Sequence, residues 1–217
     1  MVPACALVLL FASCQAQEKK TETVAALTPS PAPATQPTAS PVTPQAAEPG
    51  ALAELTLEPA SSKLEIVVSK ITRSHAGSFQ QFSGTASLVG DQVQAVSFDV
   101  DTASLRTDTE KLTAHIKTKD FLDVEKFPKA SFKSTSVVAK SAGSDTHEIT
   151  GQLTLHGVTQ EIKFPARIAL TPDSVTGHAE IPIDRQKFGV SYPGMPDDLI
   201  KDVVLLEPTF VFLRKKI

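Results

Sequence analysis

The sequence predicts an all-β domain with one short helix, built as a single antiparallel barrel of about eight strands. Apolar residues recur at every second position through most of the chain after residue 56, and turn signals separate these segments. A single stretch near residue 110 has helical spacing instead. Closure into a barrel would remove exposed strand edges. Alternation alone fits a two-layer sandwich as well, so the sandwich stays an alternative at this point.

The expected strands follow one another along residues 56–217. In the clearest of them, from Ile162 to Leu170, apolar residues alternate with mainly polar ones, as in a strand with one buried face. Turn signals around Gly90 and Pro172 fit connections between antiparallel neighbours. The same alternation appears at residues 64–68, 96–100, 149–155, 181–183 and 203–213.

One helix is expected between the strands. Thr107 lies three residues before Glu110, which is the spacing of a capping box and predicts a helix start at Thr107. Leu112 and Ile116 are four residues apart and share one face of that helix. Phe121 follows and can turn inward. A short amphipathic helix of this kind can lie across one end of a barrel, which favours the barrel over the sandwich.

The N-terminus carries a targeting signal. The apolar run from Ala4 to Ala12 is too short to cross a bilayer as a helix and fits the core of a secretory signal peptide over residues 1–13. The segment FASC at residues 11–14 resembles the lipobox of bacterial lipoproteins, which predicts lipidation of Cys14. A plain signal peptide with an incidental cysteine is the alternative. Either way the protein is expected to be exported. If Cys14 is lipidated, it is expected to be a periplasmic or outer-membrane-anchored lipoprotein that contacts the membrane through its N-terminus.

Residues 14–55 are expected to form a disordered tether. Seven prolines lie between Pro29 and Pro49, among Ala, Thr, Ser and Gln. Such a segment has too few large apolar side chains to build a core and stays extended and solvated. The folded domain is therefore expected at residues 56–217.

Composition and motifs argue against several function classes. The net charge is −3, with 21 Lys and Arg scattered among 24 Asp and Glu, which does not fit a nucleic-acid partner. No G-x-S-x-G motif is present, and a cleaved signal would leave no cysteine nucleophile, so no catalytic residue is assigned. No metal or cofactor site is expected either, because the five histidines lack ligand spacing. They are His75, His115, His147, His156 and His178.

Two short motifs have structural interpretations. His156-Gly157 fits a hairpin turn in which Gly157 takes a positive φ. Asp184-Arg185 fits either a charge pair near a strand end or a solvated turn. Four basic residues lie on or just after the expected helix: Lys111, His115, Lys117 and Lys119. Either they face solvent or they meet an anionic headgroup at the barrel mouth, and the sequence leaves both interpretations open.

Three segments resemble signature segments of the YceI-like family. They are DFLDVEKFPKASF at residues 120–132, LTLHGVT at 153–159 and IDRQKFGV at 183–190. The resemblance covers essentially all of residues 56–217 and departs from the common pattern at Tyr192–Val204. It implies a lipocalin-like barrel with a long apolar cavity for a polyisoprenoid, a quinone-like lipid or a fatty-acyl chain.

Strand parity and the resemblance together predict which side chains line that cavity. Phe, Ile and Leu on the inward face could also fill a solid core, so the cavity depends on the resemblance as well as on the pattern. The expected lining residues are Phe98, Leu112, Ile116, Phe121, Phe132, Leu153, Leu155, Phe164, Ile168 and Phe210.

The expected function is to bind, store or transfer a long apolar lipid in the cell envelope, without catalysis. Two alternatives remain. One is a lipid-modifying enzyme of lipocalin-like fold, which needs a carboxylate or histidine facing the cavity. The other is an accessory partner that presents a quinone to a membrane redox protein. A homodimer is also open, with no sequence feature that argues for it.

Overall fold

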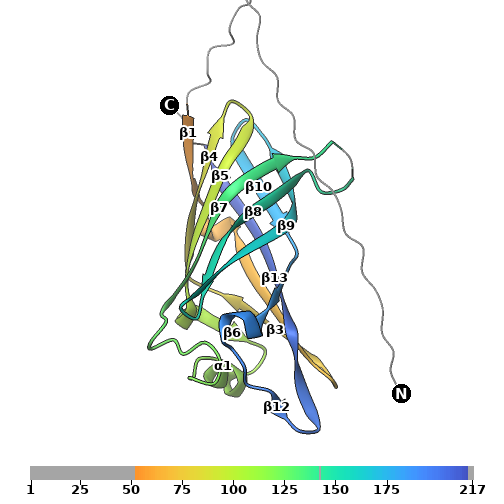
Figure 1. Ribbon diagram of the computed structural model, residues 1–217. Coiled ribbons are helices and arrows are strands. Elements are labelled where there is room, and N and C mark those ends of the chain that lie inside the picture. Colours follow the sequence, from red (N-terminus) through yellow and green to blue (C-terminus); the bar gives the residue numbers. More distant parts are fainter. Residues whose placement is uncertain (1–51, 142, 215–217) are drawn as a thin grey trace, which may run out of the picture. The chain divides into compact units, whose positions relative to one another are not determined.

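The computed structural model describes residues 52–141 and 143–214 (Figure 1). These residues form 13 strands, one short α-helix and three 3₁₀ turns. The helix is α1 (Glu110–Ile116), and the turns are Pro59–Ser61, Thr102–Ser104 and Arg185–Phe188. The strands are β1 (Leu52–Leu57), β2 (Lys63–Lys70), β3 (Ser74–Phe79), β4 (Phe82–Val89), β5 (Gln92–Asp101), β6 (Leu105–Thr107), β7 (Lys129–Ala139), β8 (His147–Leu155), β9 (Val158–Leu170), β10 (Ser174–Ala179), β11 (Ile181–Asp184), β12 (Gly194–Met195) and β13 (Asp198–Leu213).

Eight of the strands close into a ring. Their order is β1, β4, β5, β7, β8, β9, β10 and β13, and each pair is antiparallel. The ring closes where β1 meets β13, with Thr56 opposite Leu213 and Leu57 opposite Phe212. The predicted eight-stranded antiparallel barrel is therefore confirmed, and the sandwich alternative is wrong.

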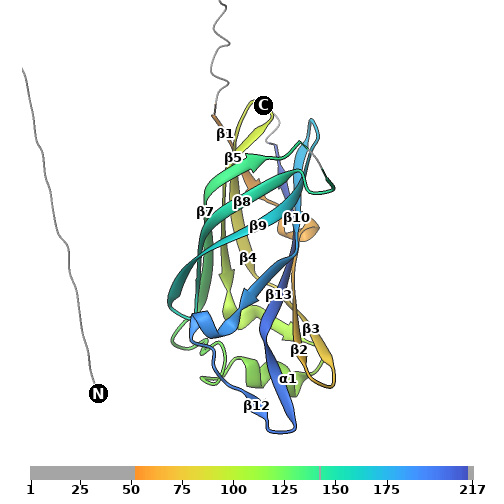
Figure 2. The same ribbon diagram turned by 45° about the vertical axis from the view of Figure 1, so that its right-hand side comes forward.

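The remaining strands extend the barrel wall along β13. With 16 residues, β13 is long enough to pair with different neighbours along its length. Its C-terminal part pairs with β1 and β10, and its N-terminal part pairs with β2 and β11. The strand β2 pairs in turn with β3, and β3 with β6. Figures 1 and 2 show α1 and β12 at one end of the barrel and β1 at the other.

The helix begins later than the capping-box pattern predicted. Its N-cap is Thr109, whose hydroxyl accepts a hydrogen bond from the Leu112 amide at 3.3 Å. Thr107 is instead the last residue of β6, where it pairs with Gly77 of β3. The sheet pairing keeps Thr107 extended, so the cap moves two residues along the chain.

The first strand begins at Leu52, inside the segment expected to be part of the tether. Leu55 and Leu57 are buried and alternate with exposed neighbours. This is the pattern of a strand that forms part of the barrel wall. The sequence boundary at residue 56 was set by the last proline-rich stretch, which hid this short strand. The predicted signal peptide at residues 1–13, the lipidation at Cys14 and most of the predicted tether lie outside the described residues. Within the described ranges, no helix has the length and apolar character needed to cross a bilayer.

The hairpin between β8 and β9 confirms the predicted turn at His156-Gly157. His156 has a φ of 51° and Gly157 a φ of 75°, so both central residues are left-handed, as in a two-residue hairpin loop. The Phe127 ring lies directly against Gly157, in the space that a β-carbon would occupy. His156 is held in place by its Nδ1 atom, 3.1 Å from the carbonyl oxygen of Phe188.

Candidate functional site: an apolar cavity inside the barrel

A cavity of about 200 Å³ lies inside the barrel. The surface that it presents is entirely apolar. Residues of β2, β3, β5, β7 to β11 and β13 form its wall, and the segment from Ile116 to Leu122 contributes at one end. A space of this kind favours an apolar occupant, because it offers dispersion contacts and no hydrogen-bond partner.

Nine of the ten side chains expected at the cavity line it, and one does not. Leu112 is the exception: it lies in the first half of α1 and packs, partly buried, against the hydrophobic core. Ile116, at the other end of the same helix, does line the cavity. Contact of any of these residues with a ligand stays a prediction. The nine that line the cavity are Phe98, Ile116, Phe121, Phe132, Leu153, Leu155, Phe164, Ile168 and Phe210.

Several lining residues were missed by the sequence analysis. Most of them lie at alternate positions of strands that it did predict, so parity could have found them. Gly177 is different, because a glycine has no side chain whose polarity predicts burial. It lies on the same face of β10 as Val175 and Ala179. Others that line the cavity are Leu64, Ile66, Val68, Phe79, Val96, Val100, Ile183, Val204 and Leu206.

Two glycines let phenylalanine rings lie close against the wall. A β-carbon at Gly84 would be 2.6 Å from Cδ1 of Phe98, and one at Gly151 would be 2.5 Å from Cζ of Phe132. Each ring therefore covers a position where any side chain would collide with it. The two glycines thus let the rings of Phe98 and Phe132 lie directly against the sheet at these positions.

One end of the cavity is closed by a cluster that we call the plug. Its five members are buried in the hydrophobic core and none of them lines the cavity. They come from β1, β4, β10 and β13, at the end of the barrel where β1 closes the ring. The plug consists of Leu55, Leu57, Leu88, Val175 and Phe212.

The other end of the cavity is covered by α1 and the segment after it. Ile116, Phe121 and Leu122 form part of the wall there. The rings of His115 and Tyr192 pack against Phe121, at centroid distances of 5.0 and 5.1 Å. Tyr192 belongs to the segment that departs from the common family pattern, so this departure places an aromatic side chain over the covered end.

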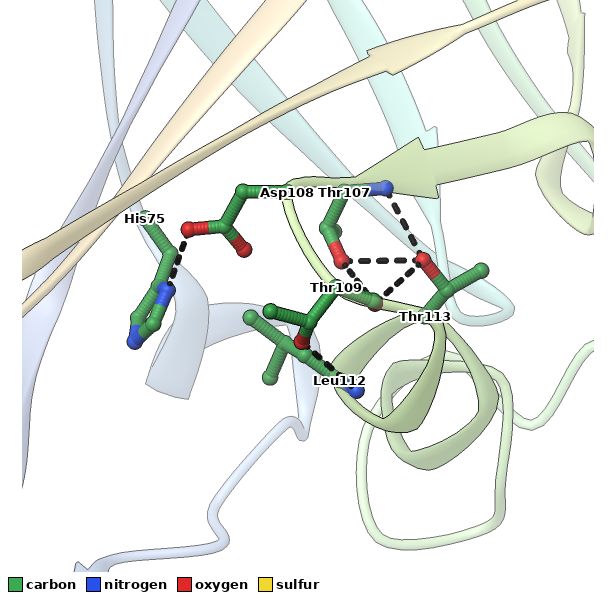
Figure 3. Close-up of polar contacts among 6 residues, drawn as sticks. All are labelled: His75, Thr107, Asp108, Thr109, Leu112 and Thr113. Carbon is green, nitrogen blue, oxygen red and sulfur yellow. Dashed lines mark hydrogen bonds and ion pairs between the residues drawn. The ribbon is translucent and has the colours of Figure 1, made fainter.

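A compact polar network fastens α1 to the barrel (Figure 3). The buried Thr113 hydroxyl accepts the amide proton of Thr107 at 2.9 Å and lies 3.0 Å from the carbonyl oxygen of Thr109. One residue along, the Asp108 carboxylate lies 2.8 Å from Nδ1 of His75 on β3. The helix is thus held to β6 through Thr113 and its preceding turn is held to β3 through Asp108.

The buried Arg185 does not pair with Asp184, as the sequence analysis considered. Arg185 is 5% exposed and donates hydrogen bonds to the carbonyl oxygens of Val190, Ile200 and Lys201 at 2.7, 3.3 and 3.2 Å. Its carboxylate partner is Asp202, at 3.1 Å. Asp184 instead accepts from the Gln186 amide and caps the 3₁₀ turn Arg185–Phe188.

The titratable groups with shifted pKa values do not converge on one site. Burial lowers the pKa of His147, whose Nδ1 atom lies 2.8 Å from the Thr146 hydroxyl. Burial and the nearby Arg106 charge lower the pKa of Lys117, just after α1. Within the part of the chain that the structure describes, no group of three or more His, Cys, Asp or Glu side chains is placed to hold a metal ion.

Comparison with known proteins agrees with this architecture. The UPF0312 protein of Pseudomonas putida strain F1 is 37% identical over 126 residues, which cover 54% of this chain and 65% of that protein. The chain therefore matches less than two thirds of the length of this curated relative.

Two solved structures share the fold at low sequence identity. Burkholderia cenocepacia BcnA has a TM-score of 0.63 and 23% identity, over 71% of this chain and 98% of that one. A domain from Saccharophagus degradans, described as polyisoprenoid binding and implicated in plant cell wall breakdown, has a TM-score of 0.59 and 13% identity, over 76% and 100%. The YceI-like domain model matches residues 55–212, which span the barrel from β1 to β13. The chain therefore belongs to the YceI-like domain family.

Proposed function

We propose that the protein binds a long apolar lipid chain in the barrel and stores or transfers it within the cell envelope. The observation that carries this proposal is the cavity inside the barrel, whose surface is entirely apolar. Burial of a chain in such a space is worth roughly 0.8 kcal/mol per CH₂ group before ordering costs, so affinity can grow with chain length without a directed polar contact. A polyisoprenoid, an isoprenoid quinone tail and a fatty-acyl chain all have this chemistry, and the Saccharophagus relative of the same fold is described as polyisoprenoid binding.

We place no chemical step in this cavity. Arg185 and His178 are the basic residues at its wall. The Arg185 guanidinium already donates to three carbonyl oxygens and to Asp202, and Nδ1 of His178 lies 3.0 Å from the Thr209 hydroxyl on the neighbouring strand. A group that holds the surrounding turn in this way serves the barrel rather than a reaction. The role of the protein is then to keep an apolar chain out of water.

Native mass spectrometry of the full chain, purified from bacterial envelopes, tests the proposal. A bound mass in stoichiometric amount that is lost on solvent extraction supports it, and lipid analysis of the extract identifies the class of chain. An apo mass from membrane-rich preparations, together with no uptake of added geranylgeraniol or palmitate, would refute it.

The location of the protein is a second part of the proposal. FASC at residues 11–14 supports lipidation of Cys14 and anchoring of the barrel to an envelope membrane through the N-terminal segment. Substitution of Cys14→Ala should move the protein from the membrane fraction to the soluble periplasmic fraction while leaving the circular dichroism of the barrel unchanged. Membrane association that persists in this variant would contradict lipid anchoring at Cys14.

A further inference from the structure

Gly177 of β10 occupies an unusual place in the cavity wall. Its neighbours on the inward face of the strand are Val175 and Ala179, and all three residues share the same parity. A β-carbon built at Gly177 meets no atom within 4 Å. By contrast, a β-carbon at Gly84 or Gly151 would collide with a phenylalanine ring. Gly177 is therefore a notch in the wall that opens into free space.

This notch lies where the cavity ends. The last lining residues toward the plug on β9, β10 and β13 are Ile168, Gly177 and Phe210. Gly177 pairs with both of the others, so the lining stops at the same level on these three adjacent strands. Two residues further toward the plug, Val175 pairs with Phe212, and neither of these lines the cavity. The next positions beyond Gly177 are thus filled by the plug.

The distance from the notch to the covered end sets the length of the cavity. Phe210 lies at the level of the notch, and Ile200 lines the cavity ten positions away on the same strand. Ten residues of strand span about 33 Å, or about 25 Å along the axis of a barrel whose strands tilt by about 40°. An extended apolar chain that enters beside α1 would reach the notch with its far end.

We infer that Gly177 sets the maximum chain length that the cavity accepts, by leaving room for the tip of the bound chain next to the plug. This inference rests on the proposed lipid-binding function and adds to it a residue that determines specificity. A side chain at position 177 would shorten the cavity from its blind end while leaving the covered end untouched. Long chains would then lose contacts that shorter chains never make.

The test compares wild-type full chain with Gly177→Phe for binding of farnesol, geranylgeraniol and pentaprenol, prenols of increasing length, by native mass spectrometry. Gly177→Phe should weaken binding of the longest prenol by on the order of tenfold to a hundredfold, because one isoprene unit is excluded from the cavity. Farnesol binding should change much less. The open space at Gly177 and its ordinary φ mean that the new ring needs no movement of the backbone.

Matched variants distinguish an effect on chain-length specificity from a general loss of folding or binding. Thr176→Phe adds the same ring one residue earlier, on the outer face of β10, and should leave all three affinities unchanged. Gly177→Val should give a smaller effect in the same direction and replaces Gly177→Phe if the larger side chain prevents folding, as judged by far-ultraviolet circular dichroism. An equal loss for all three prenols, or no loss for pentaprenol, would overturn the inference while leaving lipid binding in place. Failure of the wild-type chain to bind any prenol or fatty acid would overturn the proposed function itself.

Discussion

Replacement of Arg185 by methionine should destabilise the barrel strongly, although methionine is apolar and of similar length. The change leaves the buried carbonyl oxygens of Val190 and Ile200 without their donors. Each buried acceptor left without a partner costs about 1–3 kcal/mol, whereas the Asp202 carboxylate left behind is 58% exposed and its lost pairing adds little. We therefore expect Arg185→Met to lower the free energy of unfolding by about 3–5 kcal/mol.

Urea unfolding followed by far-ultraviolet circular dichroism measures this loss. With a slope of about 2 kcal/mol per molar urea, the midpoint should fall by about 1.5–2.5 M. The control is Asp202→Asn, because Asp202 is 58% exposed and asparagine keeps an oxygen that can accept from Arg185. That variant should cost less than about 1 kcal/mol. A midpoint for Arg185→Met within about 0.5 M of wild type, or equal losses in the two variants, would show that Arg185 does not hold this turn.

Three further results are expected. Gly157→Ala should lower the free energy of unfolding by about 1–2 kcal/mol for the left-handed backbone alone, and it must also displace the Phe127 ring. Gly90→Ala is the control, because Gly90 is also left-handed but its β-carbon meets open space. The thermal midpoint should therefore fall further for Gly157→Ala than for Gly90→Ala. The lowered pKa of His147 means that the folded state binds its proton less tightly than the unfolded state, so stability is complete above about pH 6.5 and declines as the pH falls through that value. Urea midpoints of His147→Gln should accordingly show a shallower decline than wild type in that range, and an unchanged decline would exclude His147 as its source. Thr113→Val removes the hydroxyl that accepts the amide proton of Thr107 on β6. The free energy of unfolding should fall by about 1–3 kcal/mol, and amide hydrogen exchange in α1 should become faster. Unchanged exchange in α1 would contradict the anchoring role of this network.

The sequence allowed the barrel and most of its inner face to be predicted, because both follow from a period of two. Once Ile162 to Leu170 is assigned to a strand with one buried face, the inward direction of Phe164 and Ile168 follows from parity alone. Leu112 was wrongly predicted to line the cavity, because it lies on a helix and strand parity does not apply to it. Its position depends on where α1 crosses the end of the barrel, and that is decided by pairing of Thr107 with β3.

Features that depend on strand register could not be predicted. Arg185 pairs with Asp202 because β11 runs antiparallel to β13, with Ile183 opposite Val204. The sequence shows only the neighbouring Asp184, so it offered a charge pair with Asp184 or a solvated turn, and neither describes the buried Arg185. The notch at Gly177 could not be predicted either. It depends on the plug at the next inward position of β10 and on the free space around the position of a β-carbon at Gly177.

The pairing of β1 with β13 has a consequence for how the domain forms. The first and last strands of the barrel are neighbours, and they meet at Thr56 with Leu213 and at Leu57 with Phe212. The ring therefore cannot close until the C-terminal strand has been synthesised, and contacts of such large sequence separation slow folding because the loop entropy is lost before they form. Until that moment β1 can pair with β4, but the plug lacks Phe212. Closure of the ring thus completes both the plug and the wall of the cavity, so the cavity exists only once β13 has joined β1 and β10.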